Sequence, residues 1–143
     1  MKTAESVLDM IVAAKPIRPD AGRNSELVDL SQHSVPWSAI GGFSTRLGIE
    51  QSELLRLIGM SERTALRRRG GYLKPDEADR LLRIGRIFEE ATRVFGDERK
   101  AAEWLRDPSP FFYNAPPLSF LDSDGGTQAV SEELGRIDYG LFA

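Results

Sequence analysis

Hydroxyl and guanidinium side chains gather in residues 61–70, which read SERTALRRRG. Arginine can hold a guanine edge or a phosphate through two parallel hydrogen bonds, and the free N–H groups at a helix N-terminus also attract phosphate. The segment is therefore a candidate for DNA contact, and the alternative is a solvated basic surface. The side chains that would make such contacts are Ser61, Arg63, Thr64, Arg67, Arg68 and Arg69.

The period of a helix gives these side chains different directions. On a helix that starts after Ser61, Arg63 and Arg67 are four residues apart and share one face. Arg68 and Arg69 would lie at the flanks of that face. The apolar pair at 65–66 would then face the preceding helix.

A helix-turn-helix pattern around this segment favours the DNA interpretation. Residues 51–58, QSELLRLI, predict a first helix, and Gly59 supplies the turn because glycine accepts a positive φ. Ser61 is a suitable N-cap for the second helix, which is expected to end at Gly70-Gly71. Two short helices joined by a glycine-containing turn are typical of DNA-binding modules.

Charge is distributed unevenly along the chain of 143 residues, whose net charge is −3. Residues 43–74 hold seven basic and three acidic residues, a local +4, whereas residues 107–143 hold one basic and six acidic, a local −5. The first segment would attract nucleic acid and the second would repel it. Two different partners are therefore expected.

The elements that must position these residues are all predicted to be helical. Residues 3–14 have a short amphipathic pattern, residues 15–20 are a proline-containing linker, and residues 21–42 are weakly patterned up to Gly41-Gly42. Pro75, an acidic first turn and Gly96 delimit the clearest helix. No segment alternates like a strand, so the predicted fold class is all-α. The remaining expected helices span about 97–106 and 126–137.

The helix predicted at 75–95 has an apolar seam wider than one small core requires. The seam consists of Leu81, Ile84, Phe88, Ala91 and Phe95, and Leu82, Ile87 and Val94 widen it. This width suggests a homodimer interface, although such seams are also buried within monomers. A favourable pair between Glu89 and Arg93 is expected on the exposed side.

Catalytic and metal chemistry find little support in the residues. There is no cysteine, and His33 is the single histidine, in a weakly patterned region without visible partners. The paired glycines at 41–42, 70–71 and 125–126 lack the spacing of a phosphate-binding loop and are expected to be caps and turns. We therefore expect no enzyme activity, no catalytic residue, no metal site and no cofactor. Nothing suggests a membrane span or a secretory signal, so we expect a cytoplasmic protein.

Two aromatic segments need explanation. The last residues, DYGLFA at 138–143, place large apolar side chains where termini are usually polar and frayed. The loop PFFYNAPP at 110–117 contains a cluster of three aromatic residues. Each segment either packs on its own core or docks on a partner, and the residues leave both alternatives open.

Five segments in register resemble the Xre/MbcA/ParS antitoxins, which pair with RES-domain toxins. The segments, GMSERTALRRRG, LKPDEADRLLRIGRIFEEATRVFG, WLRDPSP, PLSFLD and ELGRIDYG, lie within residues 43–143. The resemblance implies an Xre-like helix-turn-helix that binds operator DNA and represses its own operon. It also implies a C-terminal domain that blocks the active site of an NAD-degrading toxin.

The resemblance also carries residue roles and domain bounds. It assigns DNA reading to the side chains at 61–69 named above. It assigns toxin contact to Arg136, Ile137, Asp138, Tyr139, Gly140, Leu141 and Phe142. The expected units are an N-terminal extension at 1–42, the helix-turn-helix at 43–74, and a dimerisation and toxin-binding domain at 75–143. The alternatives are a free-standing repressor, and a toxin inhibitor that no longer binds DNA.

Overall fold

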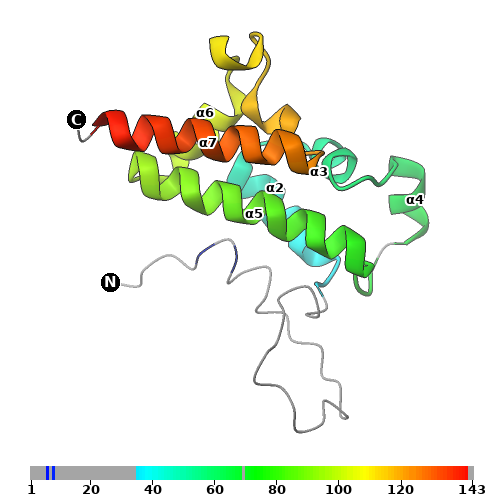
Figure 1. Cartoon of the computed structure of the whole chain (residues 1–143). Helices are drawn as coiled ribbons and strands as arrows, with labels where there is room; N and C mark the ends of the chain where they lie inside the picture. Colours follow the sequence, from blue (N-terminus) through cyan, green and yellow to red (C-terminus); the bar gives the residue numbers. More distant parts are fainter. Residues whose placement is uncertain (1–5, 7, 9–34, 69, 142–143) are drawn as a thin grey trace, which may run out of the picture.

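The computed structural model describes residues 6, 8, 35–68 and 70–141, and within these it consists of helices and turns without a strand. The expected all-α fold is confirmed. The helix expected at 3–14, its linker, His33, Arg69 and Phe142 lie wholly or mostly outside the described residues. The helices in chain order are α2 (Ser38–Leu47), α3 (Gln51–Leu57), α4 (Glu62–Arg67), α5 (Pro75–Phe95), α6 (Glu98–Arg106) and α7 (Asp124–Leu141), with 3-10 turns at Pro110–Phe112 and Pro117–Phe120 (Figure 1).

Helix α5 is the central element, and its predicted bounds are confirmed. Pro75 occupies its first turn, and Gly96, with φ of 74°, caps its C-terminus. The helix packs against both α6 and α7. The expected pair between Glu89 and Arg93 is replaced by partners from other segments. Glu89 Oε1 accepts from the Leu8 N–H at 3.3 Å, and Arg93 Nη1 donates to Asp138 Oδ2 at 3.2 Å.

The wide apolar seam of α5 is covered by the chain itself. Leu82, Ile87 and Val94 are all buried, along with the narrower seam, whereas Phe95 is partly buried. The prediction of a dimer interface at this seam is therefore wrong, because the sequence could not show that both α6 and α7 pack on α5. Leu8 also lies partly buried against this core.

Helices α5 and α7 run side by side in the same direction (Figure 1). Polar contacts fix their register at three levels. Arg83 Nη1 donates to Asp124 Oδ1 at 2.5 Å, Ser131 Oγ donates to Glu90 Oε2 at 3.0 Å, and Arg93 reaches Asp138 near the end of α7. The separations in sequence are 41, 41 and 45 residues, so both helices advance together.

Two expected glycine turns are instead helical. Gly41-Gly42 lie inside α2, so that helix crosses the boundary expected between residues 42 and 43. Gly125-Gly126 lie in the first turns of α7, where a Cβ on Gly126 would overlap the carbonyl of Phe120. Only Gly70-Gly71 form the expected turn, with φ of 90° and 73°. At Gly41-Gly42 and Gly125-Gly126, tertiary packing overrides the weak helix propensity of glycine.

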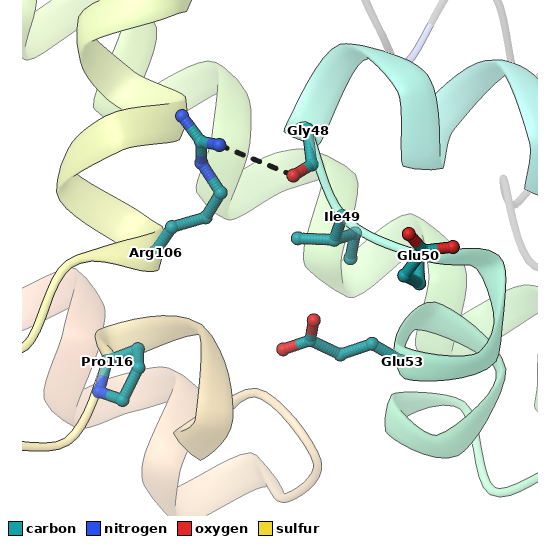
Figure 2. Close-up of a pocket in the computed structure, with 6 residues that line it drawn as sticks. All are labelled: Gly48, Ile49, Glu50, Glu53, Arg106 and Pro116. Atoms are coloured by element: carbon teal, nitrogen blue, oxygen red, sulfur yellow. Dashed lines mark hydrogen bonds between the residues drawn. The ribbon is translucent and has the colours of Figure 1, made fainter.

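The N-terminal helices are fastened to α6 by arginines. Arg46 of α2 forms a two-point contact with Glu98 of α6, with Nε–Oε1 and Nη2–Oε2 distances of 2.6 and 2.7 Å. Figure 2 shows Arg106 at the end of α6 reaching the turn after α2, where its Nη1 donates to the Gly48 carbonyl at 3.3 Å. The helix-turn-helix and the C-terminal helices therefore share one framework.

Candidate functional site

Helix α4 is held in place by its cap and by the turn before it. Ser61 Oγ accepts from the Thr64 N–H at 3.2 Å, which confirms the predicted N-cap, and Ser61 Oγ also donates to Thr64 Oγ1 at 3.0 Å. Gly59 has φ of 81°, and a Cβ there would come within 2.5 Å of Arg80 Nη1. That same Arg80 nitrogen donates to the Ile58 carbonyl at 3.2 Å, so α5 stabilises the turn between α3 and α4.

The outer face of α4 carries two arginines and a leucine. Arg63 and Arg67 are exposed and four residues apart, as the sequence predicted. Ala65 is buried and Leu66 is 63% exposed, and both line a hollow together with Leu55 of α3, so the pair faces α3 although α3 does not cover Leu66. The helix is six residues long and ends at Arg67, so one buried position suffices to dock it. An exposed leucine beside arginines could contact a thymine methyl group.

Arg68 has a structural partner that the sequence did not reveal. Its Nη1 donates to Glu77 Oε2 at 2.7 Å, while Glu77 Oε1 accepts from the Lys74 N–H at 2.8 Å. Burial would raise the pKa of Glu77, but the hydrogen bonds from Arg68 and Lys74 and the charge of Arg68 together lower it. The same hydrogen bond raises the pKa of Arg68. Arg68 therefore joins the end of α4 to the start of α5.

The turn after α4 is tied to the segment before α2. The Trp37 N–H donates to the Gly71 carbonyl at 2.9 Å, and the Leu73 N–H donates to the Val35 carbonyl at 2.8 Å. Tyr72, which is half exposed, lies between these two bonds and pairs with Pro36 in an isolated bridge. The backbone after α4 is therefore constrained at more than one point, and the orientation of α4 does not depend on a single contact.

Acidic side chains border one flank of α4. A hollow of about 640 Å³ includes Glu50, Glu53 and Glu62 in its lining, and these are the three acidic residues of 43–74. The first two also line a neighbouring hollow, of about 440 Å³, with Arg106 opposite them (Figure 2). Carboxylates repel phosphate, so a phosphate backbone would approach the face that carries Arg63 and Arg67 more readily than this flank.

Replacing Arg68 by alanine is expected to lower the free energy of unfolding by about 2 kcal/mol, because the Glu77 carboxylate is only 7% exposed and loses a charged donor. Urea denaturation measures this change. The control is Arg67→Ala one residue earlier, where an exposed side chain is lost and a change of at most about 0.5 kcal/mol is expected. Equal effects of the two substitutions would contradict the structural role of Arg68.

The pH dependence of this difference has a defined sign. The pKa of Glu77 is lower in the folded chain than its ordinary value. The Arg68–Glu77 pair therefore stabilises the fold at pH values above the ordinary pKa of glutamate. That contribution is lost as the pH falls through the folded-state pKa and the carboxylate is protonated. The difference in free energy of unfolding between the wild-type chain and Arg68→Ala should therefore become smaller at acidic pH.

The second candidate surface is the end of α7, which is helical where a separate tail was expected. The helix continues to Leu141, beyond the predicted end at Ile137. Tyr139 is 80% exposed, so the alternative that it packs on its own core is wrong. Within this extra turn, Asp138 accepts a hydrogen bond from Arg93 of α5.

Of the residues assigned to toxin contact, the five whose side chains the structure describes divide into two sets. Arg136, Tyr139 and Gly140 are exposed, whereas Ile137 and Asp138 are partly covered by their own chain. Arg136 donates from Nε to Glu133 Oε2 at 2.8 Å. The helix thus presents one face outward and uses the other to hold its position on α5.

A hollow of about 300 Å³ lies between α7, the end of α6 and the loop that follows α6. Glu133 and Ile137 line it from α7, and the other lining residues are Trp104, Asp107, Pro108, Ser109, Pro110 and Phe111. Aromatic, apolar and carboxylate groups thus meet beside the exposed end of α7. The sequence signal for this hollow was the proline- and aromatic-rich loop.

The two candidate surfaces lie at opposite ends of the molecule. Figure 1 shows α4 at one end and the C-terminal end of α7 at the other, with α5 running between them. Contacts at one end therefore leave the other end accessible. Within the described residues, no helix is long and apolar enough to cross a membrane, and no group of three or more histidine, aspartate or glutamate residues is arranged to bind a metal.

Comparison with known families assigns a domain to each end. Residues 26–86 match the antitoxin Xre-like helix-turn-helix domain, and residues 90–140 match the antitoxin Xre/MbcA/ParS C-terminal toxin-binding domain. The first match contains α4, and the second contains nearly all of α7 and the loop before it. The predicted order of a DNA-binding module followed by a toxin-binding module is confirmed.

Individual proteins give the same result. The chain is 30% identical to an antitoxin Xre of Yersinia enterocolitica over 126 residues, which cover 86% of this chain and 85% of the relative. An antitoxin Xre of Photorhabdus laumondii is 32% identical over 75% of this chain and 68% of its own length, and one of Pseudomonas putida is 35% identical over 65% and 58%. The chain belongs to the Xre antitoxin family. It is an antitoxin with a helix-turn-helix domain and a toxin-binding domain, not an enzyme.

Proposed function

We propose that this antitoxin neutralises a RES-domain toxin that degrades NAD, and that it does so by covering the entrance to the toxin's active site with the end of α7. The observation that carries the proposal is the exposed end of α7, within the region that matches the toxin-binding domain. The contact residues in this proposal are 136–142. A helical end can enter a cleft at little cost in conformational entropy, because its backbone is already ordered.

The second half of the proposal concerns DNA. We infer that α4 lies in the major groove of an operator in the promoter of its own operon, in the cytoplasm. Arg63 and Arg67 would bind base edges, Ser61, Thr64 and Arg69 would bind the backbone, and Arg68 would orient α4 through Glu77. Two copies would place two α4 helices about 34 Å apart, at half-sites one turn apart. Such a homodimer would need a surface other than the buried seam of α5.

A second candidate function has one observation in its favour. The carboxylates beside α4 could prevent close approach of phosphate, which would leave a toxin inhibitor that does not bind DNA. The exposed arginine face favours the first proposal. Retention of a labelled fragment of its own promoter by the purified chain distinguishes the two.

The direct test of inhibition follows NAD consumption by a purified RES-domain protein, the proposed partner of this chain. Adding the antitoxin should lower the rate of NAD consumption in proportion to the amount added. NAD consumption should stop at a fixed molar ratio of antitoxin to toxin. The antitoxin needs no bound cofactor for this inhibition. An unchanged rate with excess antitoxin would overturn the proposal.

A further inference from the structure

The loop between α6 and α7 exposes two large aromatic side chains on an ordered backbone. Phe111 is 70% exposed and Tyr113 is 92% exposed, while Phe112 between them is buried. Phe112 packs between Trp104 and Phe120, with ring centroids 6.5 and 5.1 Å away, edge-on to the first ring and tilted to the second. The loop is therefore anchored by one aromatic side chain and presents the other two to solvent.

The backbone of the loop is closed and strained at its tip. The Ser109 N–H donates to the Ala115 carbonyl at 3.1 Å, and the Asn114 N–H donates to the Ser109 carbonyl at 2.9 Å. Tyr113 and Asn114 have φ of 57° and 61°, a region that a tyrosine rarely adopts. Glycine would fit the Tyr113 position without strain, so folding alone does not explain an exposed tyrosine there.

The loop is continuous with the toxin-binding surface at the end of α7. Phe111 and Ile137 line the same hollow, and Ile137 is two residues before the exposed Tyr139. The hollow also contains the exposed Asp107, whereas the Glu133 carboxylate is buried and bound by Arg136. An apolar patch beside an exposed carboxylate fits a partner surface that is apolar at its centre and carries a basic side chain at its rim.

The charge distribution favours a different protein over a second copy of this chain. Of the six acidic residues in 107–143, Asp124, Glu133 and Asp138 are paired with arginines, whereas Asp107 is exposed beside the loop. A two-fold interface brings the same patch of each copy together, so the Asp107 carboxylates of the two copies would approach one another. We propose that Phe111 and Tyr113 form a second arm of the toxin-binding surface and insert into an apolar recess bordered by basic side chains on the toxin. This inference rests on the proposed function of α7.

Calorimetric titration of the purified RES-domain protein with three variants tests the loop contact. Phe111→Ala and Tyr113→Gly should each weaken binding by about tenfold, and the double variant by about a hundredfold. Tyr113→Gly should keep or raise the melting temperature, because it relieves the strained φ, so lost affinity cannot be attributed to unfolding. Tyr72→Ala, which removes a half-exposed aromatic side chain near α4, is the matched control and should bind as the wild type does.

The possible results distinguish failure of the loop contact from failure of the proposed toxin inhibition. If the wild-type chain binds and silences the enzyme but the loop variants bind equally well, the second arm is wrong and the proposed function stands. If the wild-type chain neither binds nor silences it, the proposed function fails and the second arm fails with it. If the variants instead convert a dimer of this chain into monomers in sedimentation, the loop joins two copies and the inference is overturned.

Discussion

Deleting residues 139–143 should abolish toxin inhibition while leaving the fold intact. Tyr139 and Gly140 are exposed, whereas the buried residues of α7, Val130 and Leu134, precede the cut. The two deleted residues whose side chains are described, Tyr139 and Gly140, therefore contribute contact area that the core does not use. Because interface energy concentrates in a few large side chains, we expect inhibition to weaken by at least about a hundredfold.

The measurement is NAD consumption by the toxin at increasing concentrations of the truncated chain, with helicity followed by circular dichroism. Gln128→Ala, an exposed substitution in the first half of α7, is the control and should inhibit fully. The same truncation should leave promoter binding unchanged, because α4 is at the other end of the molecule. Loss of helicity or of promoter binding would mean that the end of α7 supports the fold, and the contact proposed for it would be wrong.

The second large effect is expected at the exposed arginines of α4. Replacing Arg63 or Arg67 by alanine should cost about 1–3 kcal/mol of operator binding if each arginine reads a base edge. The loss should be smaller on DNA of unrelated sequence, so sequence preference should relax. A phosphate contact would instead weaken binding on every sequence and lower the salt slope by about one unit.

Two controls make the arginine result specific. Arg86→Ala removes one exposed positive charge from α5 and should change operator affinity little. Arg68→Ala is not an equivalent variant, because Arg68 is bound to Glu77 and its loss acts through stability. Unchanged affinity in both Arg63→Ala and Arg67→Ala would remove the DNA-reading role from α4 and favour an inhibitor that does not bind DNA.

Local sequence signals predicted the parts of the fold that are governed by local energetics. Ser61 was recognisable as a cap because its hydroxyl satisfies a free N–H group at the helix start. Pro75 and Gly96 defined α5 because one has a preset φ and the other accepts a positive φ. These features depend on neighbours within a few residues, and each is confirmed.

Features that depend on distant contacts could not be predicted in the same way. Gly41-Gly42 looked like an interruption, yet α2 continues through them with Ile40 and Phe43 buried on either side. The length of α7 was underestimated because Arg93, on another helix, holds Asp138. The seam of α5 suggested a dimer because nothing in its own spacing shows how many helices of the same chain cover it.

The candidate sites show the same division. The face shared by Arg63 and Arg67 followed from helix period alone, whereas the exposure of Leu66 and the pairing of Arg68 with Glu77 required the tertiary structure. At the other end, the aromatic loop was visible in the sequence. Its division into buried Phe112 and exposed neighbours was not, because three consecutive residues in a loop have no period to assign their directions.

The central claim is that opposite ends of one antitoxin chain bind DNA and toxin at the same time. The most direct test mixes purified antitoxin, the proposed RES-domain toxin and a fragment of the antitoxin's own promoter, and measures the mass of the particles formed. The account predicts one particle that contains all three components and consumes no NAD. Particles that contain either DNA or toxin, but never both, would contradict it.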